Sequence, residues 1–193
     1  MTVAGMLLAA GEGSRLGRPK ALVELGGTSL AARGVDLLTQ AGCAPVHVVT
    51  GAVDVDLPGV TLVSNPDWRT GMASSLRAGL ASLPDDPDGP DAVVVALVDQ
   101  PLITPDVVRR LIDVYRDGAR AVVATYDGRQ RNPVLLRRDL WADAAAAAHD
   151  DVGARAYLRA HPDVVTEVEC GDIADPADID TAADLAALER RLS

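Results

Sequence analysis

A segment near the start of the chain combines residues that together can hold phosphate groups. Three glycines and three cationic side chains lie within Gly11-Glu12-Gly13-Ser14-Arg15-Leu16-Gly17-Arg18-Pro19-Lys20. Gly11 and Gly13 have no Cβ, so backbone N–H groups there can turn towards an anion, and Arg15 and Lys20 add positive charge. The segment predicts a phosphate-binding loop, although a plain surface connection can have the same composition.

Two common nucleotide-binding motifs do not fit this segment. No Gly-Lys-Ser or Gly-Lys-Thr closes the loop, so it is not a Walker loop. The dinucleotide fingerprint requires a third glycine at the position of Leu16. A Rossmann oxidoreductase is therefore the less favoured interpretation.

A carboxylate follows the second long apolar run of the chain. Asp99 comes directly after Val93–Val98, at the expected carboxyl end of a buried strand. An isolated aspartate at such a place often forms a turn or caps a helix. A bound triphosphate, however, needs a hard cation, and Mg²⁺ is commonly held by one or two carboxylates together with phosphate oxygens and water. Asp99 is the first candidate metal ligand.

Strands and helices must alternate along the chain to position these residues. Short apolar runs bounded by Gly or Pro predict the strands, and apolar residues at helical spacing predict the helices. The expected strands are Val3–Ala9, Val46–Thr50, Val60–Val63, Ala92–Val98, Ala121–Thr125, Val134–Leu136 and Val164–Val168. The expected helices are Ser29–Gln40, Ser74–Leu83, Pro105–Tyr115, Asp139–His149, Gly153–His161 and Thr181–Arg191. The pattern predicts one α/β domain over residues 1–193, a Rossmann-like, open, mostly parallel sheet with helices on both faces and ligands at the strands' carboxyl ends.

Composition excludes several classes of function. The 193 residues carry a net charge of -10, which disfavours a nucleic-acid reader. Cys43 and Cys170 lie far apart, so neither a zinc site nor a disulfide framework is indicated. The first apolar run is too short for a signal or transmembrane segment, which predicts a cytoplasmic protein without a membrane partner.

The glycine segment, read as LAAGEGSRLGRPKAL, resembles the signature loop of the MobA-like nucleotidyltransferases. The resemblance implies the nucleotide-diphospho-sugar-transferase type of fold and a loop that surrounds a nucleoside triphosphate. It assigns phosphate charge to Arg15 and Lys20. Nucleotide contacts are implied for Leu8, Ala9, Ala10, Gly11 and Gly13. The Ala-Ala-Gly form is similar to cytidylyltransferases rather than guanylyltransferases, which implies CTP.

Two acidic motifs support the same resemblance. VALVDQPLI is similar to the family's metal-binding strand end, which assigns Asp99 to Mg²⁺, and its Asp-Gln-Pro form resembles the molybdenum-cofactor cytidylyltransferase branch. The tail from Asp178 to Leu185 resembles D/N-x-D/N-T-P-x-D-L, with Ala182 in place of proline. This match implies that Asp180 is the second metal ligand. The alternative is that Asp180 and Thr181 cap the following helix.

Three further segments resemble binding motifs of the family. The stretch from Asn65 to Leu80 is similar to N-P-x-W-x-x-G-M-x-S-S-L, which implies nucleotide contacts for Asn65, Gly71, Ser74 and Ser75. Two other segments resemble G-x-x-G-(H/N)-P-V and G-D-x-G-A-R on the acceptor side, with Arg131 and Asp150 where glycine is usual. They imply acceptor contacts for Asn132, Pro133 and Arg155. Trp68 is interpreted as a packing residue.

The resemblance implies transfer of CMP from CTP to molybdenum-loaded molybdopterin, with Mg²⁺ as the working ion. A phosphate monoester is mostly ionised at neutral pH because its second pKa is about 6, so attack needs no protein base. A xanthine-dehydrogenase-type enzyme or its maturation factor would receive the product. Alternatives are a guanylyltransferase, a transferase acting on a sugar phosphate or another phosphorylated acceptor, and a maturation factor that binds the cofactor without turnover.

Overall fold

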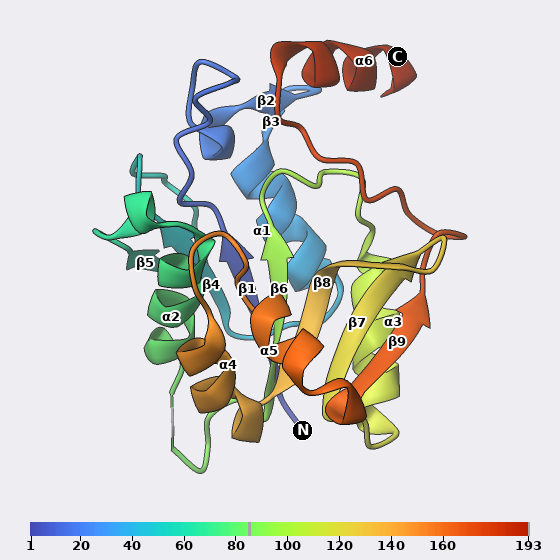
Figure 1. The fold of residues 1–193 in the computed structure, drawn as a ribbon. Coiled ribbons are helices and arrows are strands. Elements are labelled where there is room, and N and C mark those ends of the chain that lie inside the picture. Colours follow the sequence, from blue (N-terminus) through green and yellow to red (C-terminus); the bar gives the residue numbers. More distant parts are fainter. Residues whose placement is uncertain (85, 193) are drawn as a thin grey trace.

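A seven-stranded sheet forms the centre of the protein, seen in a computed structural model that describes residues 1–84 and 86–192 (Figure 1). The strands lie in the order β5-β4-β1-β6-β8-β7-β9. Their bounds are β1 Val3–Leu8, β4 Val46–Thr50, β5 Thr61–Ser64, β6 Ala92–Leu97, β7 Ala121–Tyr126, β8 Arg129–Arg137 and β9 Val165–Glu169. Asp85, in the expected loop between Pro84 and Pro90, lies outside the described residues, as does Ser193.

Strand β1 occupies the middle of the sheet, as its continuous apolar sequence predicts. All its residues are buried, and it pairs in parallel with β4 and β6. In this register Leu8 lies opposite Val49 on one side and Leu97 on the other. β8 runs antiparallel to both β6 and β7, and β7 pairs in parallel with β9. The sheet is therefore mixed and mostly parallel, which confirms the predicted fold class.

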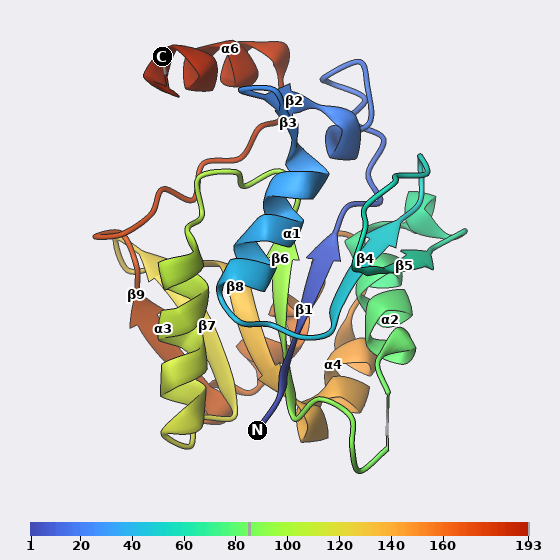
Figure 2. The same cartoon turned by 180° about the vertical axis from the view of Figure 1, so that it is seen from behind.

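Helices cover both faces of the sheet. Helices α1 (Leu30–Gln40) and α3 (Pro105–Arg116) cover one face, and α2 (Met72–Ser82), α4 (Trp141–Ala147) and α5 (Arg155–Ala160) cover the other (Figures 1 and 2). Alternate residues of β1 enter the two cores, Leu7 on the α1 side and Met6 on the α2 side. Since strand side chains alternate between faces, one central strand contributes to both cores.

Several elements differ from the predicted bounds. A small hairpin, β2 (Glu24–Leu25) with β3 (Thr28–Ser29), was not expected. β8 begins at Arg129 rather than at Val134, because a tight turn at Asp127 and Gly128, both with positive φ, returns the chain directly into it. Short 3₁₀ turns occupy Lys20–Leu22, Trp68–Thr70, Arg138–Leu140 and Pro162–Val164.

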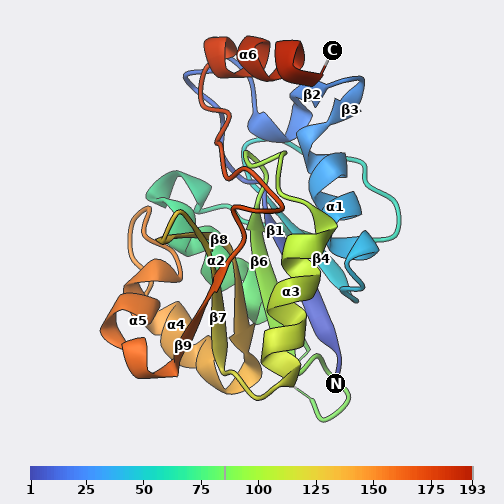
Figure 3. The ribbon, with the colours of Figure 1, turned by 90° about the vertical axis from the view of Figure 1, so that its right-hand side faces the viewer.

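The last helix lies at the carboxyl end of the central strands. Helix α6 (Ala182–Leu192) sits over β2 and β3, after a segment that passes the end of β6 (Figures 1 and 3). Thr181 caps the helix: its Oγ1 accepts from Asp184 N at 3.2 Å, and the Asp184 carboxylate accepts from Thr181 N at 2.7 Å. None of the described helices combines the length and apolar character needed to cross a membrane.

Candidate nucleotide-binding site

The glycine loop leaves the carboxyl end of β1 in a fixed conformation. Ala9 N donates to Val49 O at 2.9 Å, which keeps the loop's start in the sheet. Gly13 has φ of 61°, and a Cβ there would lie 2.2 Å from Arg18 O. Glycine is therefore required at 13 because the loop folds back on itself. A Cβ on Gly11 would meet nothing within 4 Å, so open space borders the loop at Gly11.

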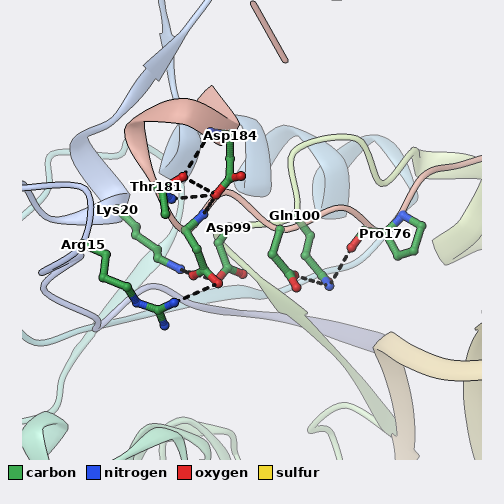
Figure 4. A network of polar contacts seen from close by, with 9 residues as sticks. Arg15, Lys20, Asp99, Gln100, Pro176, Thr181 and Asp184 are labelled. Atoms are coloured by element: carbon green, nitrogen blue, oxygen red, sulfur yellow. Dashed lines mark hydrogen bonds and ion pairs between the residues drawn. The ribbon is translucent and has the colours of Figure 1, made fainter. Parts of the chain in front are cut away.

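Three segments distant in the sequence meet at Lys20 (Figure 4). Its Nζ lies 2.7 Å from Oδ2 of Asp99, after β6, and 2.6 Å from Oδ1 of Asp180, before α6. Arg15 approaches the same centre more loosely, with Nη1 3.9 Å from Asp180 Oδ2 and its side chain 73% exposed. The structure thus joins all four predicted catalytic and metal residues in one cluster.

The charges of this cluster stabilise the ammonium form of Lys20. Burial acts to lower the pKa of Lys20, but the carboxylates of Asp99 and Asp180 outweigh burial, so its pKa is raised above the ordinary value. Lys20 is therefore a permanent cation at neutral pH. It is one positive charge between two carboxylates.

The same two carboxylates fit a divalent cation. Oδ1 of Asp99 is buried and has no hydrogen-bond partner within the described part of the chain, so it is available to a further ligand. No group of three His, Cys, Asp or Glu residues that could hold a metal was found among residues 1–84 and 86–192. An ion here would need phosphate oxygens and water as its other ligands, which is the habit of Mg²⁺.

The C-terminal segment delivers Asp180 by main-chain and side-chain contacts. Ile179 N donates to Asp99 O at 2.8 Å. Gln100, labelled in Figure 4, donates from Nε2 to Asp178 Oδ1 at 2.9 Å. Thr181, not Asp180, has the capping role at α6. The Asp180 carboxylate is consequently directed to Lys20 and Arg15.

A cavity of about 260 Å³ lies beside this cluster, between the ends of β1 and β6 and the start of α2. It adjoins a wider cleft along the glycine loop, lined by residues that include Gly13 and Arg15. The predicted nucleotide contacts that line the cavity are Leu8, Ala10, Gly11, Lys20, Gly71 and Ser75. The buried Ala9 is not among the lining residues.

Asn65 and Ser74 are not among the residues that line this cavity; they line a separate pocket together with Asp67 and Arg77. Both are buried, and Asn65 Nδ2 donates to the hydroxyls of Ser74 at 2.9 Å and Ser75 at 3.0 Å. Asn65 Oδ1 also accepts from Asp67 N at 3.0 Å. These bonds fix the turn before α2, so the structure gives Asn65 and Ser74 a bracing position for the wall that contains Gly71.

Two of the three predicted acceptor residues line a neighbouring pocket. Asn132 and Arg155 line it, and it shares Leu8, Met72 and Leu97 with the nucleotide cavity. Pro133 is buried within β8 and does not line this pocket. The two pockets therefore adjoin across the carboxyl ends of β1 and β6, which is where a nucleotide and an acceptor must meet.

Five residues that line the nucleotide cavity had no site role assigned from the sequence: Trp68, Met72, Leu97, Val98 and Asp151. Two of them, Trp68 and Asp151, are not aliphatic. Trp68 lines the nucleotide cavity, because its ring packs where Gly51 leaves no side chain. Asp151 lines it as well, and its Oδ1 accepts from Met72 N at 3.1 Å. Both lie in segments that carry the family resemblance, which was the available signal for them.

The comparisons with known proteins agree with this geometry. Residues 5–165 match the family described as the MobA-like NTP transferase domain. The chain is 35% identical to nicotine blue oxidoreductase of Paenarthrobacter nicotinovorans, covering 93% of this chain and 92% of that protein. It is 31% identical to molybdenum cofactor guanylyltransferase of Rhizobium johnstonii, covering 98% and 93%.

A solved structure shows the same architecture over the whole chain. Rv0371c of Mycobacterium tuberculosis H37Rv superposes with a TM-score of 0.84 at 28% identity, covering 98% of each chain. A complex of Rv0371C with manganese gives a TM-score of 0.80 at 27% identity, again covering 98% of each chain. The chain therefore belongs to the MobA-like NTP transferase family and is a MobA-like nucleotidyltransferase.

Proposed function

We propose that this protein transfers CMP from CTP to molybdenum-loaded molybdopterin, giving molybdopterin cytosine dinucleotide and pyrophosphate. The observation that carries the proposal is the placement of Lys20 between Asp99 and Asp180, beside a cavity under a glycine loop. Such a site holds a triphosphate by charge and has room for a base. The similarity to a molybdenum cofactor guanylyltransferase supports a molybdopterin acceptor.

The chain's own residues act by orienting the reactants and balancing charge. An oxygen of the acceptor phosphate attacks the α-phosphorus of CTP; the new P–O bond forms as the bond to the bridging oxygen breaks, and pyrophosphate leaves with the electron pair. The acceptor phosphate is already ionised, so no side chain needs to remove a proton. Lys20 and Arg15 neutralise the phosphates, and the loop around Gly11 and Gly13 positions them for in-line attack.

Asp99 and Asp180 are the residues that would hold Mg²⁺. Bound there with phosphate oxygens, the ion would neutralise charge on the transferred group and on pyrophosphate. Lys20 contacts both carboxylates in this structure, so its ammonium must exchange them, at least in part, for phosphate oxygens when the nucleotide enters. The manganese complex of Rv0371C supports a divalent ion in this fold.

The choice of CTP rests on the Ala9-Ala10-Gly11 form of the loop. Ala10 lines the cavity, so a residue of different size there would alter the space for the base. GTP is the main competitor because a relative over the full chain is a guanylyltransferase. We place the protein in the cytoplasm, where it would pass its product to a xanthine-dehydrogenase-type enzyme or that enzyme's maturation factor.

The similarity to nicotine blue oxidoreductase favours a second candidate function, the reduction of a dye-like substrate. Such a reaction needs an electron donor, for which NADH and NADPH are the probes to use. This candidate predicts bleaching of nicotine blue with NADH or NADPH and no release of pyrophosphate. A nucleotidyltransferase should release pyrophosphate and should not bleach nicotine blue. Testing one preparation in both assays therefore distinguishes the two candidate functions.

The decisive experiment measures pyrophosphate release from CTP, GTP, ATP and UTP with Mg²⁺ and molybdenum-loaded molybdopterin. We expect turnover with CTP that is lost in Asp99→Ala. Preference for GTP would retain the chemistry and overturn the assignment of CTP. No turnover with any nucleotide would direct the search to another phosphorylated acceptor or to a cofactor-binding role without catalysis.

A further inference from the structure

The acceptor pocket is shaped by an irregularity in the β7–β8 hairpin. Val123 pairs with Val134, whereas the next residue of β7, Ala124, pairs with Arg131. Asn132 and Pro133 are therefore extra residues on β8. A bulge of this kind bends its strand and changes the direction of side chains. It occurs where Gln130, Arg131 and Asn132 form the polar side of the pocket.

Arg131 brings a positive charge to this pocket from an exposed position. The chain has arginine where the resembling motif usually has glycine, so the family pattern assigns no role to this side chain. Within residues 1–84 and 86–192, its guanidinium donates no hydrogen bond to a protein acceptor. Arg155 lines the same pocket, and its guanidinium is likewise not engaged in a hydrogen bond or ion pair with the described residues. Two cations thus meet at one pocket without protein anions bound to them.

The pocket that Arg131 lines adjoins the nucleotide cavity. Leu8, Met72 and Leu97 line both, at the carboxyl ends of β1 and β6 and the start of α2. Arg131 therefore lies on the acceptor side of the place where the nucleotide would bind.

We propose that Arg131 binds the attacking phosphate of the acceptor and makes this chain selective for phosphomonoester acceptors. This inference rests on the proposed transfer reaction. The pocket floor is apolar and includes Val95, Val123 and Leu158, so it offers the remainder of the acceptor little charge stabilisation. Its open volume is only about 20 Å³, so the phosphate binds at the arginine-lined rim rather than deep in the pocket.

The test compares Arg131→Gln and Arg131→Lys with Arg129→Gln. Arg129 lies on the same strand and is exposed, but it does not line the pocket. With molybdenum-loaded molybdopterin as the probe, we expect Arg131→Gln to raise the KM for the acceptor roughly 10- to 100-fold, the range for losing a charged hydrogen bond. The KM of Arg131→Gln for CTP should stay within about twofold of the wild-type value. Arg131→Lys should have a KM for the acceptor between those of Arg131→Gln and wild type. Arg129→Gln should have the wild-type KM for the acceptor.

A second measurement separates this inference from the proposed function. Calorimetric titration of the full chain with the same acceptor, without nucleotide, should show weaker binding for Arg131→Gln than for wild type. Equal affinities, or an effect on the KM for CTP instead of the acceptor, overturn the role of Arg131 while leaving the transfer reaction intact. Absence of acceptor binding to wild type overturns both the inference and the proposed acceptor.

Discussion

Lys20 and Asp180 lie 160 positions apart in the sequence, yet Nζ of one is 2.6 Å from Oδ1 of the other. Asp99, which follows β6, contacts the same ammonium. The C-terminal segment therefore adds the second carboxylate of the cluster. A group that binds either carboxylate must compete with Lys20. This relationship leads to two predictions about the carboxylates and the ammonium.

Replacing either carboxylate by its amide should weaken Mg²⁺ binding and slow catalysis. Asp99→Asn removes a charge at the buried end of the cluster, and we expect turnover to fall by about 10²- to 10³-fold, the effect of losing one electrostatic group from a transition state. In Asp180→Asn turnover should fall less, because Asp180 is more exposed than Asp99. This variant should need a higher Mg²⁺ concentration for half-saturation. Pyrophosphate release measured against Mg²⁺ concentration gives both values.

Asp172→Asn is the matched control for these variants. Asp172 is an exposed carboxylate that forms an ion pair with Arg110, which is not a member of the cluster. It should leave the Mg²⁺ dependence unchanged. Asp99→Asn with wild-type turnover at saturating Mg²⁺ would contradict the assignment of Asp99.

Removing the ammonium should separate metal binding from catalysis. In Lys20→Met the two carboxylates lose their shared cation, so we expect tighter binding of Mn²⁺ without nucleotide, measured by calorimetry, together with loss of turnover. In the wild type the pKa of Lys20 is raised, so the ammonium stays charged between about pH 7 and 9. Raising the pH over this range should therefore not increase the Mn²⁺ affinity of wild type by deprotonating Lys20. Mn²⁺ affinity in Lys20→Met at or below that of wild type would show that the ammonium does not compete with the ion.

Sequence patterns predicted the strands and helices well where the residues are apolar. They missed the start of β8, because Arg129 to Asn132 are polar and show none of the alternation that marks a buried strand. They also missed β2 and β3, whose two residues each are too short to form a pattern. Local signals therefore predicted all seven strands of the sheet, including the edge strands β5 and β9, but not the polar first half of β8 or the small hairpin.

The candidate site was predictable as a set of residues but not as a geometry. Asp and Thr are both good N-caps, so the sequence around Asp180 fits a cap as well as a ligand. Only the fold, which passes Ile179 along the end of β6, directs this carboxylate to Lys20. Trp68 likewise required the structure, because its place in the cavity wall depends on Gly51 in a distant loop.

The stability of the protein should fall in mild acid because of His47. Its side chain is buried on β4 against Ser82, with Nδ1 2.7 Å from the hydroxyl, and burial lowers its pKa below 6.5. Below pH 6.5 the unfolded chain therefore binds more protons than the folded chain. The free energy of unfolding should decrease from about pH 6.5 downwards, by at most about 1.4 kcal/mol per pH unit for this group, until the folded pKa is reached.

Urea unfolding at several values between pH 7 and 5 measures this contribution. His47→Gln does not titrate there, so its stability should decline less steeply than that of wild type. Identical slopes for wild type and His47→Gln would exclude His47 as the source.

Two glycines with nearly equal φ allow a test of the contact between α2 and the turn at Asp150. Gly71 has φ of +110° and a Cβ there would lie 2.5 Å from Asp150 O, whereas Gly118 has φ of +111° with nothing within 4 Å. Both alanine variants should lose about 1–3 kcal/mol of stability from backbone strain. Gly71→Ala should lose more, because Asp150 O must move away and with it the bond that it accepts from Ala73 N at 2.9 Å.

The same pair of variants distinguishes a local loss from a functional one. Gly71 and Asp151 both line the nucleotide cavity, so displacing the turn should raise the KM for CTP in Gly71→Ala. Gly118 follows α3 and is absent from that lining, so Gly118→Ala should keep the wild-type KM. Thermal unfolding together with CTP kinetics measures both effects. Equal stabilities and equal KM values in the two variants would mean that the turn at Asp150 moves at no measurable cost and does not determine the shape of the cavity.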